Sequence, residues 1–542
     1  MHGLNRSSLR NGLTGWDALC LLLGLANAIL YASLLPLWEG FDEPFHFGYV
    51  ETLAVERALP VLGRAALSKE IEESIRLAPA SHVVRQNIPD VMTFAEYHAL
   101  PEQERAERRR RLWSIPTAWR LAAGTGSANY EAQQAPLAYA AQALLASYWA
   151  SEPLPARVWR IRMVVAVAAA LALYWALHVL AGILELGIRA RRLMLFVVFC
   201  WQMLYAATAH VANDWLAAAL SAWFFVALLR FREHPSRAPA VALGAVVAGG
   251  LLAKAYFLVW AALAAAAVTE MAIRKRAQPR VLLWAVLPIL FGAAPWYARN
   301  LMIYGNLSGM LQSTMGLTVA DTFRAAFSVP WVDALWKIAH AAVWSGNNSF
   351  NAFSASTAGT LVLLLAAALA LWAWTARTSR RLGSEVWLAS GCLLYAAAHL
   401  YAACVFWAEK PGVVSTAPWY VPAATAPFAA LVALGVERGG RLSRFLSAAL
   451  AAVSAYIISA TYAFKLIPQY AGCGTGPVRW NSLQACYIEN APRTLRLLGD
   501  TALGPVWLIL GLAALVTILA VFLAIAIIRS EQETQVAISP QK

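Results

Sequence analysis

Long apolar runs separated by short polar connections make up most of the chain. A helix needs about 20 mostly apolar residues to cross the hydrocarbon core of a bilayer. Runs of this kind predict spanning helices at roughly 17–37, 161–184, 193–210, 214–231, 238–254, 255–273, 281–297, 357–376, 386–406, 417–436, 445–463 and 505–528. The pattern therefore predicts an all-α polytopic membrane protein with about twelve transmembrane helices.

Composition excludes several other classes of protein. Hydrophobic residues make up 60% of the 542 residues and charged residues 13%, with a mean hydropathy of +0.56. A soluble protein carries about 25% charged residues, so this chain has too little polar material to cover a water-facing surface. A soluble enzyme, a disordered chain and a disulfide-rich secreted module are excluded. Residues 1–542 are expected to form a single integral membrane domain.

Basic residues set the expected orientation in the membrane. The net charge is +14, and every second connection between the predicted spans contains an arginine cluster. Arg6 and Arg10 precede the first span, and Arg529 follows the last. Because Lys and Arg favour the cytoplasmic side, these connections and both termini are predicted to be cytoplasmic. Three long connections then face outward, namely 38–157, 298–356 and 464–504.

The first outer loop contains an unusually basic stretch. Arg105 and Arg108–Arg111 alternate with Glu104 and Glu107, and Leu112, Trp113 and Trp119 follow. This stretch predicts either an amphipathic helix at the lipid headgroups or a solvated charged helix. The predicted fold therefore has a long first outer loop that carries interfacial helices. A nucleic-acid partner is not expected on this face.

Two cysteines stand apart from the other four. Cys473 and Cys486 lie in the third outer loop, whereas the rest fall within apolar spans. An outward, oxidising compartment permits disulfides. We therefore predict a disulfide between Cys473 and Cys486.

Carboxylates stand where the first span ends. The segment Glu39–Phe47 contains Asp42, Glu43 and His46 among aromatic residues. Placing carboxylates near lipid is costly, and such a group can act as a general base or hold a metal. The structural alternative is a helix-terminal turn, with Asp42 as the N-cap ahead of Pro44. His46 could bind a divalent metal together with Asp42, although hydrogen bonding in an aromatic setting is the favoured interpretation, and dependence on a divalent metal stays open.

Further segments extend this pattern. Asn129–Tyr139 reads NYEAQQAPLAY, His210–Trp215 contains an Asn-Asp turn, and Pro295–Asn306 reads PWYARNLMIYGN. Together with Phe41–Phe47, they resemble polytopic membrane glycosyltransferases of the GT-C superfamily, of the bacterial type that uses polyprenyl-phosphate sugars. The resemblance runs from about residue 38 to 306, and all its motifs fall on the predicted outer side.

The chain departs from the family pattern at two places. Ala135 stands where the family segment has a proline. A weaker match at Trp419–Pro422 has Trp419 where many relatives have an arginine, which removes one expected phosphate ligand.

The resemblance implies an inverting glycosyltransferase that moves a sugar from a polyprenyl-phosphate-linked donor to an acceptor on the outer face of the membrane. The acceptor is a lipid, a glycan or a protein, and the location is the plasma (inner) membrane of a bacterium. The implied roles are catalysis by Asp42 and Glu43, donor-phosphate binding by Arg299, Lys254 and Tyr304, and substrate binding by His46, Tyr130, Gln133, Gln134, Asn213, Asp214, Trp419 and Tyr420.

Most of these residues also have a structural interpretation. Lys254 could extend from a helix end toward the membrane surface, and Arg299 could pair with a carboxylate of an outer loop. Asn213 and Asp214 could cap the next helix, and the two glutamines could fix a loop to the bundle.

Two other functions stay open. A twelve-span transporter or lipid-linked flippase fits the hydropathy pattern, but the two halves show no internal repeat and the polar residues gather at the outer face, not at the membrane midplane. A polymerase or ligase of surface polysaccharide shares the lipid-phosphate chemistry.

Overall fold

The computed structural model describes residues 15–81, 84, 91–309, 317–349, 351–473 and 483–538. Arg6 and Arg10, used above for orientation, lie outside the described residues. Parts of the second and third expected outer loops, at 310–316, 350 and 474–482, also lie outside them.

Helices long and apolar enough to cross a membrane dominate the described residues. Nine meet this test, and a tenth does if the bent pair α10 (Ile188–Cys200) and α11 (Gln202–Thr208), at 53° to each other, is one span. The chain is therefore an integral membrane protein. The nine are Gly15–Leu34 (α2), Leu154–Ile183 (α9), Asp214–Glu233 (α12), Pro279–Tyr304 (α15 to α16), Ala355–Thr378 (α20 and η5), Leu382–Glu409 (α21), Pro418–Arg438 (η6 and α22), Leu442–Tyr470 (α23 to α24) and Val506–Arg529 (in α27).

Two expected spans are shorter than the others. The helices α13 (Arg237–Leu251) and α14 (Phe257–Ile273) stand where spans 238–254 and 255–273 were expected, and both fall below the length test. The count of twelve therefore stays a prediction. The break between these helices contains Lys254.

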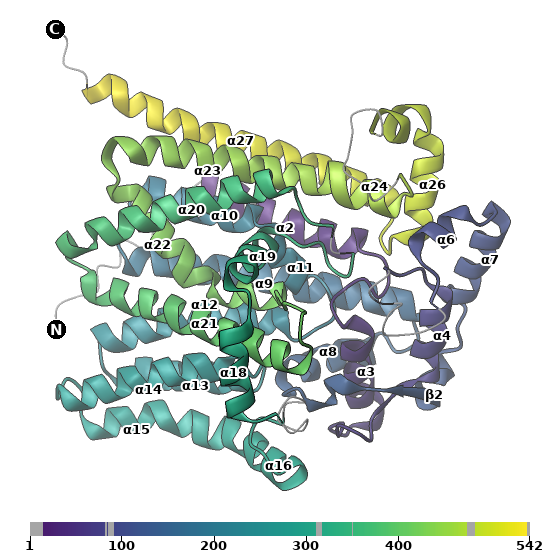
Figure 1. Cartoon of the computed structure of the whole chain (residues 1–542), viewed down its shortest axis with the longest axis horizontal. Helices are drawn as coiled ribbons and strands as arrows, with labels where there is room; N and C mark the ends of the chain where they lie inside the picture. The colour runs from purple at the N-terminus through teal and green to yellow at the C-terminus, as the bar shows by residue number, and fades with distance from the viewer. Residues whose placement is uncertain are drawn as a thin grey trace.

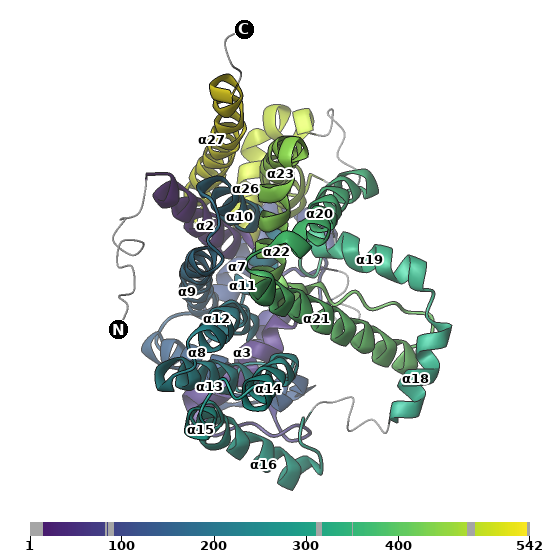
Figure 2. The same ribbon diagram turned by 90° about the vertical axis from the view of Figure 1, so that its left-hand side faces the viewer.

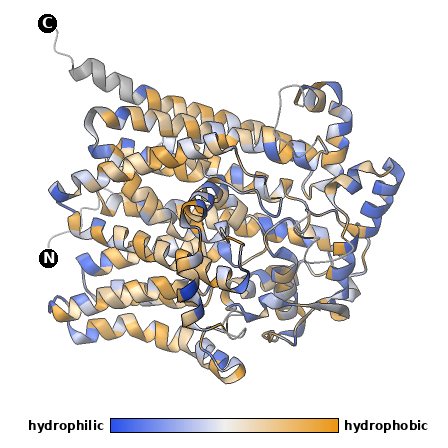
Figure 3. Cartoon of the chain, viewed as in Figure 1, coloured by the Kyte–Doolittle hydropathy of each residue, from blue (hydrophilic) through white to orange (hydrophobic). Residues whose placement is uncertain are grey.

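The long helices run side by side in one bundle (Figure 1, Figure 2). The first helix, α2, packs against α9 and α27, and α12 packs against α9 and α13. α2 begins and α27 ends at the same end of the bundle (Figure 1). Hydrophobic residues follow the long helices, whereas hydrophilic residues gather at the opposite end and at the helix ends (Figure 3).

The first expected outer loop folds into a small helical unit at one end of the bundle (Figure 1). Its apolar core includes Phe47, Tyr49, Leu67, Ile71 and Val158. A two-stranded antiparallel sheet pairs Ala66 with Ala128. The elements of the loop are α3 (Glu43–Glu51), η1 (Thr52–Glu56), β1 (Ala66–Ser68), α4 (Lys69–Leu77), α6 (Phe94–Ala99), α7 (Glu102–Trp113), η2 (Thr117–Leu121), β2 (Ala123–Ala128), η3 (Tyr130–Gln133) and α8 (Leu137–Tyr148).

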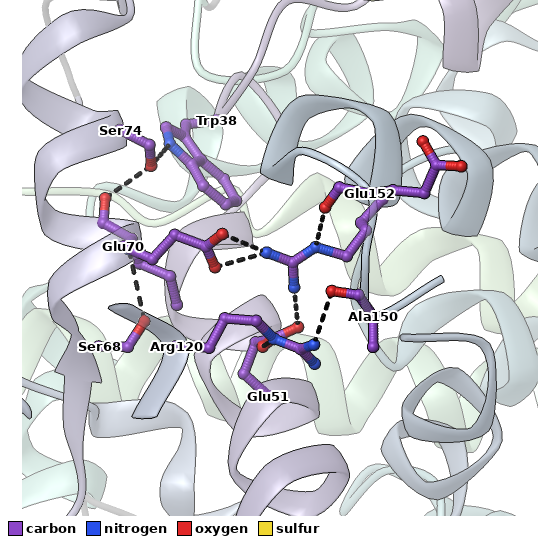
Figure 4. Close-up of polar contacts among 10 residues, drawn as sticks. Trp38, Glu51, Ser68, Glu70, Ser74, Arg120, Ala150 and Glu152 are labelled. Atoms are coloured by element: carbon purple, nitrogen blue, oxygen red, sulfur yellow. Dashed lines mark hydrogen bonds and ion pairs between the residues drawn. The ribbon is translucent and has the colours of Figure 1, made fainter. Parts of the chain in front are cut away.

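A buried ion-pair cluster fastens this unit to α9 (Figure 4). Arg157, near the start of α9, donates to both oxygens of Glu70 and to Oε1 of Glu51. Arg120 donates to the other oxygen of Glu51 at 2.5 Å and to the Ala150 carbonyl at 3.2 Å. We call Glu51, Glu70, Arg120 and Arg157 the anchoring cluster, because two carboxylates and two guanidinium groups partner one another there.

The arginine-rich helix α7 packs against the outer unit and against α26. Its apolar residue Leu112 is buried in the core of the outer unit, and Trp113 packs against the same core. Arg105 pairs with Asp500 at 3.2 Å, which ties α7 to α26 (Ala491–Thr501). The helix lies at the end of the molecule away from the spanning helices (Figure 1).

The other two expected outer loops also contain helices. The second forms α18 (Val319–Ser328) and α19 (Trp331–Val343). In the third, η8 (Ala485–Glu489) precedes α26, and Cys473 and Cys486 form a disulfide with Cα atoms 5.7 Å apart.

Candidate active site

Asp42 lies in the turn between α2 and α3, directly before the first residue of α3. It stands at the N-cap position of α3, but its side chain makes no capping hydrogen bond, and its φ is 51°. Its Oδ1 accepts a hydrogen bond of 2.5 Å from the hydroxyl of Tyr130. Burial raises the pKa of Asp42. Asp42 therefore stands at the N-cap ahead of Pro44, as the structural alternative expected, but its side chain does not cap the helix.

Glu43 has a different environment from its neighbour. Both Glu43 and Arg162 of α9 are fully buried and paired with each other, and the Glu43 carboxylate also accepts from Val211 N at 2.9 Å. Burial alone would raise the pKa of Glu43, but the Arg162 guanidinium outweighs it and the pKa is lowered. Arg162 also donates to the Pro36 carbonyl, so this pair holds the end of α2 against α9.

The Lys254 side chain is buried inside the protein. Its Nζ is 2.6 and 2.7 Å from the two oxygens of Asp214, the first residue of α12. The ring of Tyr420 in η6 (Pro418–Ala424) lies 5.3 Å from the same nitrogen. Asp214 therefore balances a buried ammonium group, and neither it nor Asn213 makes a side-chain capping bond at the start of α12.

The structure adds Glu131, which the residue-by-residue predictions missed. Burial, followed by the nearby charge of Asp42, raises the pKa of Glu131 to about 8. Its Oε2 lies 3.5 Å from His46 Nδ1, and His46 also shares a 2.7 Å hydrogen bond with the Tyr139 hydroxyl. Burial keeps the pKa of His46 well below its ordinary value. Glu131 stands inside the motif Asn129–Tyr139, so the motif could have identified it. The resemblance implied roles only for its neighbours Tyr130, Gln133 and Gln134.

Several buried polar atoms around this centre have no hydrogen-bond partner. They are Glu131 Oε2, Gln133 Oε1, Asn213 Oδ1 and both ring nitrogens of His210. Asn213 Nδ2 donates to Gln134 Oε1 at 3.2 Å, which brings two predicted residues together. Buried polar groups are normally satisfied, so a cluster of unsatisfied ones is typical of a site that binds a polar ligand.

Arg299 and Tyr304 lie in a neighbouring position on α16 (Ala294–Tyr304). Arg299 donates to the Pro60 carbonyl at 3.0 Å and stacks on Trp296 at 4.8 Å, while its Nη1 is buried without a partner. The Tyr304 hydroxyl accepts from Leu62 N at 3.0 Å. Among the described contacts, Arg299 pairs with no carboxylate, so the structural ion pair that the sequence left open is not formed there.

The Arg299 position is coupled to the Asp42 centre through Tyr49. Arg299 and Tyr304 act electrostatically on the Tyr49 hydroxyl, whose pKa is raised chiefly by burial. Tyr49 donates to the Gln134 carbonyl at 3.0 Å and stacks on Tyr139 with ring centres 4.1 Å apart.

An apolar cavity of about 390 Å³ lies inside the helical bundle. Its walls come from α10, α19, α20, α22 (Thr425–Arg438) and α23 (Gly440–Ala460), and include Trp201, Phe428 and Val421, the residue after Tyr420. Trp419, which replaces an expected arginine, packs on Phe41 with ring centres 4.9 Å apart.

The described residues contain no group of three or more His, Cys, Asp or Glu side chains placed to hold a metal ion. His46 bonds to Tyr139 and approaches Glu131, which is the hydrogen-bonding interpretation of this residue.

The comparisons with known proteins give structural neighbours only. No protein-family model matches the chain, and no curated protein matches its sequence. Crystal structures of ArnT from Cupriavidus metallidurans are similar, one bound to undecaprenyl phosphate and one in the apo state, both 14% identical to this chain. The first match covers 96% of this chain and 77% of ArnT with a TM-score of 0.47, and the second covers 89% and 74% with a TM-score of 0.40. These values describe a distant likeness in fold.

Proposed function

We propose that the protein is a membrane glycosyltransferase that moves a sugar from a polyprenyl-phosphate-linked donor to an acceptor hydroxyl, with Asp42 as the general base. One observation carries the proposal: the buried Asp42 carboxylate interacts with Glu131 and with the Lys254–Asp214 pair, in a centre where several polar atoms lack partners. A nearby base and a cation are what such a transfer needs.

In the proposed reaction, the acceptor oxygen forms a bond to the anomeric carbon of the donor sugar. The bond between that carbon and the phosphate oxygen breaks, and its electron pair leaves with the lipid phosphate. The hydroxyl proton passes to Asp42. Because the acceptor attacks the face opposite the leaving group, the configuration at the anomeric carbon inverts.

The cationic residues would stabilise the charge that develops on the leaving phosphate. Lys254 supplies an ammonium group already positioned by Asp214. Arg299 supplies the unpartnered Nη1, with Tyr304 on the same helix, and a guanidinium group suits phosphate through its planar fork. The apolar cavity inside the bundle offers space for part of a prenyl chain.

The remaining site residues receive supporting roles. Glu43 would act as a positioning residue, because Arg162 and Val211 already engage its carboxylate. His46, Tyr130, Gln133, Gln134, Asn213 and Tyr420 would surround the reacting sugar, with Trp419 and Phe41 forming an aromatic wall. By the arginine bias, the site faces the outside of a bacterial plasma membrane and both termini face the cytoplasm.

The test is a transfer assay on the purified protein in lipid nanodiscs, given labelled polyprenyl-phosphate sugars and a membrane extract as the acceptor source. Wild type is expected to form a labelled product that identifies the sugar and the acceptor class. Asp42→Asn keeps the size of the side chain but removes its basicity, and should lower turnover by at least about 10²-fold.

Glu107→Gln serves as the matched control, since Glu107 is a carboxylate exposed on α7. It should leave turnover unchanged. Near wild-type turnover of folded Asp42→Asn would eliminate Asp42 as the base. Absence of product with every polyprenyl-phosphate sugar would overturn the proposed donor class.

A further inference from the structure

The helices α18 and α19 have an apolar surface that the protein does not cover. Val319, Phe323 and Phe327 on α18 are 79%, 66% and 80% exposed, and follow one another at intervals of four residues. Val332 and Trp336 continue the exposed apolar surface onto α19, at 88% and 44%. Residues four apart lie on the same side of a helix, so the three α18 side chains form one stripe.

The other two faces of α18 are of different kinds. Thr322 and Ala325 are buried, on the side that packs against the spanning helix α21. Asp321 and Arg324 form a pair at 2.8 Å with side chains 33% and 77% exposed, on the part of the helix surface between the buried residues and the apolar stripe. α18 therefore has a protein-facing, a water-facing and an apolar face, an arrangement typical of a helix lying at a lipid–water boundary.

The position of α18 in the molecule fits such a boundary. It crosses the direction of the spanning helices in Figure 1, and in Figure 2 it lies at the edge of the molecule, joined to the bundle by α19. Ser328 accepts a hydrogen bond of 3.1 Å from Trp407, near the end of α21. Other α21 side chains, such as Leu393 and Tyr401, are exposed at 72% and 56%, so the stripe continues a surface that faces lipid.

The charges on the two helices indicate what kind of lipid surface they fit. The described side chains of α18 and α19 include two acidic residues, Asp321 and Asp333, and two basic ones, Arg324 and Lys337. Both acid–base pairs are satisfied within a helix, the second at 2.7 Å. No net charge is left to select an anionic headgroup.

We propose that the α18–α19 segment is a membrane-surface element that inserts its apolar stripe into the lipid boundary, driven by apolar burial and indifferent to headgroup charge. Phe323 then lies among acyl chains and Arg324 in water. This inference rests on the chain being a membrane protein and does not depend on the proposed transferase activity.

The test compares two adjacent positions on α18 in nanodiscs of phosphatidylcholine. Phe323→Cys and Arg324→Cys are each labelled with an environment-sensitive fluorophore, in a full-length background where Cys392 and Cys404 are replaced by serine. Spin-labelled lipid should quench the label at position 323 at least about threefold more than the label at 324, and aqueous iodide should give the opposite order. Addition of phosphatidylglycerol should leave both ratios unchanged.

Equal quenching of the two labels by iodide would place the stripe in water and overturn the proposal. Equal quenching of both by lipid would contradict the separate water-facing side. Lipid quenching that appears only with phosphatidylglycerol would overturn the indifference to headgroup charge. Each labelled variant must elute as the wild-type protein does, and Val332→Cys, paired with Lys337→Cys on α19, repeats the test if a variant of α18 fails to fold.

Discussion

The anchoring cluster and the Asp42 centre are both buried groups of charges, yet they differ in how completely those charges are partnered. In the anchoring cluster, Arg157 and Arg120 satisfy both oxygens of Glu51, and Arg157 satisfies Glu70. In the Asp42 centre, the ammonium group of Lys254 contacts Asp214, and its charge also acts on the carboxyl groups of Asp42 and Glu131, whose Oε2 has no hydrogen-bond partner.

The difference separates a structural group of charges from one that is arranged for a ligand. The anchoring cluster, whose carboxylate oxygens all have partners, fixes the outer unit on α9 and leaves no carboxylate oxygen free to bind another molecule. An open set costs stability, because a buried polar atom without a partner loses its hydration. We expect unpartnered buried polar atoms where a polar substrate supplies the missing hydrogen bonds.

The largest effect is expected from breaking the closed cluster. Arg157→Met removes the guanidinium group and leaves Glu51 and Glu70 buried without it, and loss of one partner of a buried pair costs about 3–5 kcal/mol. The thermal unfolding midpoint in detergent should fall steeply, whereas turnover per folded molecule should stay near wild type.

Arg160→Met is the matched control on the same helix. Arg160 pairs with Glu152 at 2.9 Å, but both side chains are more than one-third exposed, so this pair should contribute about 0–1 kcal/mol. Equal falls in the midpoint for the two variants would contradict the distinction between the anchoring cluster and an ordinary surface pair.

A second prediction concerns the proton on Glu131. With its pKa raised to about 8, Glu131 is protonated at neutral pH, and raising the pH ionises it beside Asp42. That second negative charge would repel the donor phosphate, so wild-type turnover should fall about tenfold per pH unit above this pKa. Glu131→Gln stays neutral and should remove the alkaline fall.

The pH dependence of folding stability should also reveal the proton on Glu131, and its direction can be predicted. Between the ordinary carboxyl pKa of 4.5 and about 8, the folded protein holds a proton that the unfolded chain releases. Stability therefore falls as the pH rises through this range, and Glu131→Gln should reduce that slope. An unchanged pH–rate profile and an unchanged slope in this variant would show that Glu131 is ionised throughout.

The smallest effect is expected at Gln133, whose buried Oε1 lacks a partner. Gln133→Leu should lower turnover but leave the unfolding midpoint unchanged or slightly higher, because no hydrogen bond of this oxygen is lost. Gln469→Leu is the control: Gln469 Oε1 accepts from Asn351 at 2.8 Å, so its loss should cost about 1 kcal/mol. A larger loss of stability at Gln133 than at Gln469 would mean that Gln133 is structural.

The sequence predicted the bundle well, because lipid imposes a simple requirement on each spanning segment. Long apolar runs could be recognised one at a time, and the break at Lys254 was visible as a polar residue between two of them. Asp42 and Asp214 were predicted because they stand in motifs, and Lys254 because it is a basic residue expected near the outer face. In the structure, Lys254 contacts Asp214, and both act electrostatically on Asp42.

The partners inside the bundle could not be predicted in the same way. Arg162 stands within an apolar run and pairs with Glu43, 119 residues earlier in the chain. Hydropathy predicts that a segment crosses the membrane but not which side of it faces another helix. The anchoring cluster was missed for the same reason, since Arg157 and Glu70 are 87 residues apart.

The shortness of α13 and α14 has a consequence for the depth at which the protein works. With 15 and 17 residues, they extend about 22 and 26 Å, less than the hydrocarbon thickness of about 30 Å. Where these two helices cross a bilayer, they fall short of its full hydrocarbon thickness, so the lipid beside them must thin or admit water. The thickness of the bilayer, which the length of the acyl chains sets, should therefore affect how the protein sits in the membrane, independently of any residue in the site.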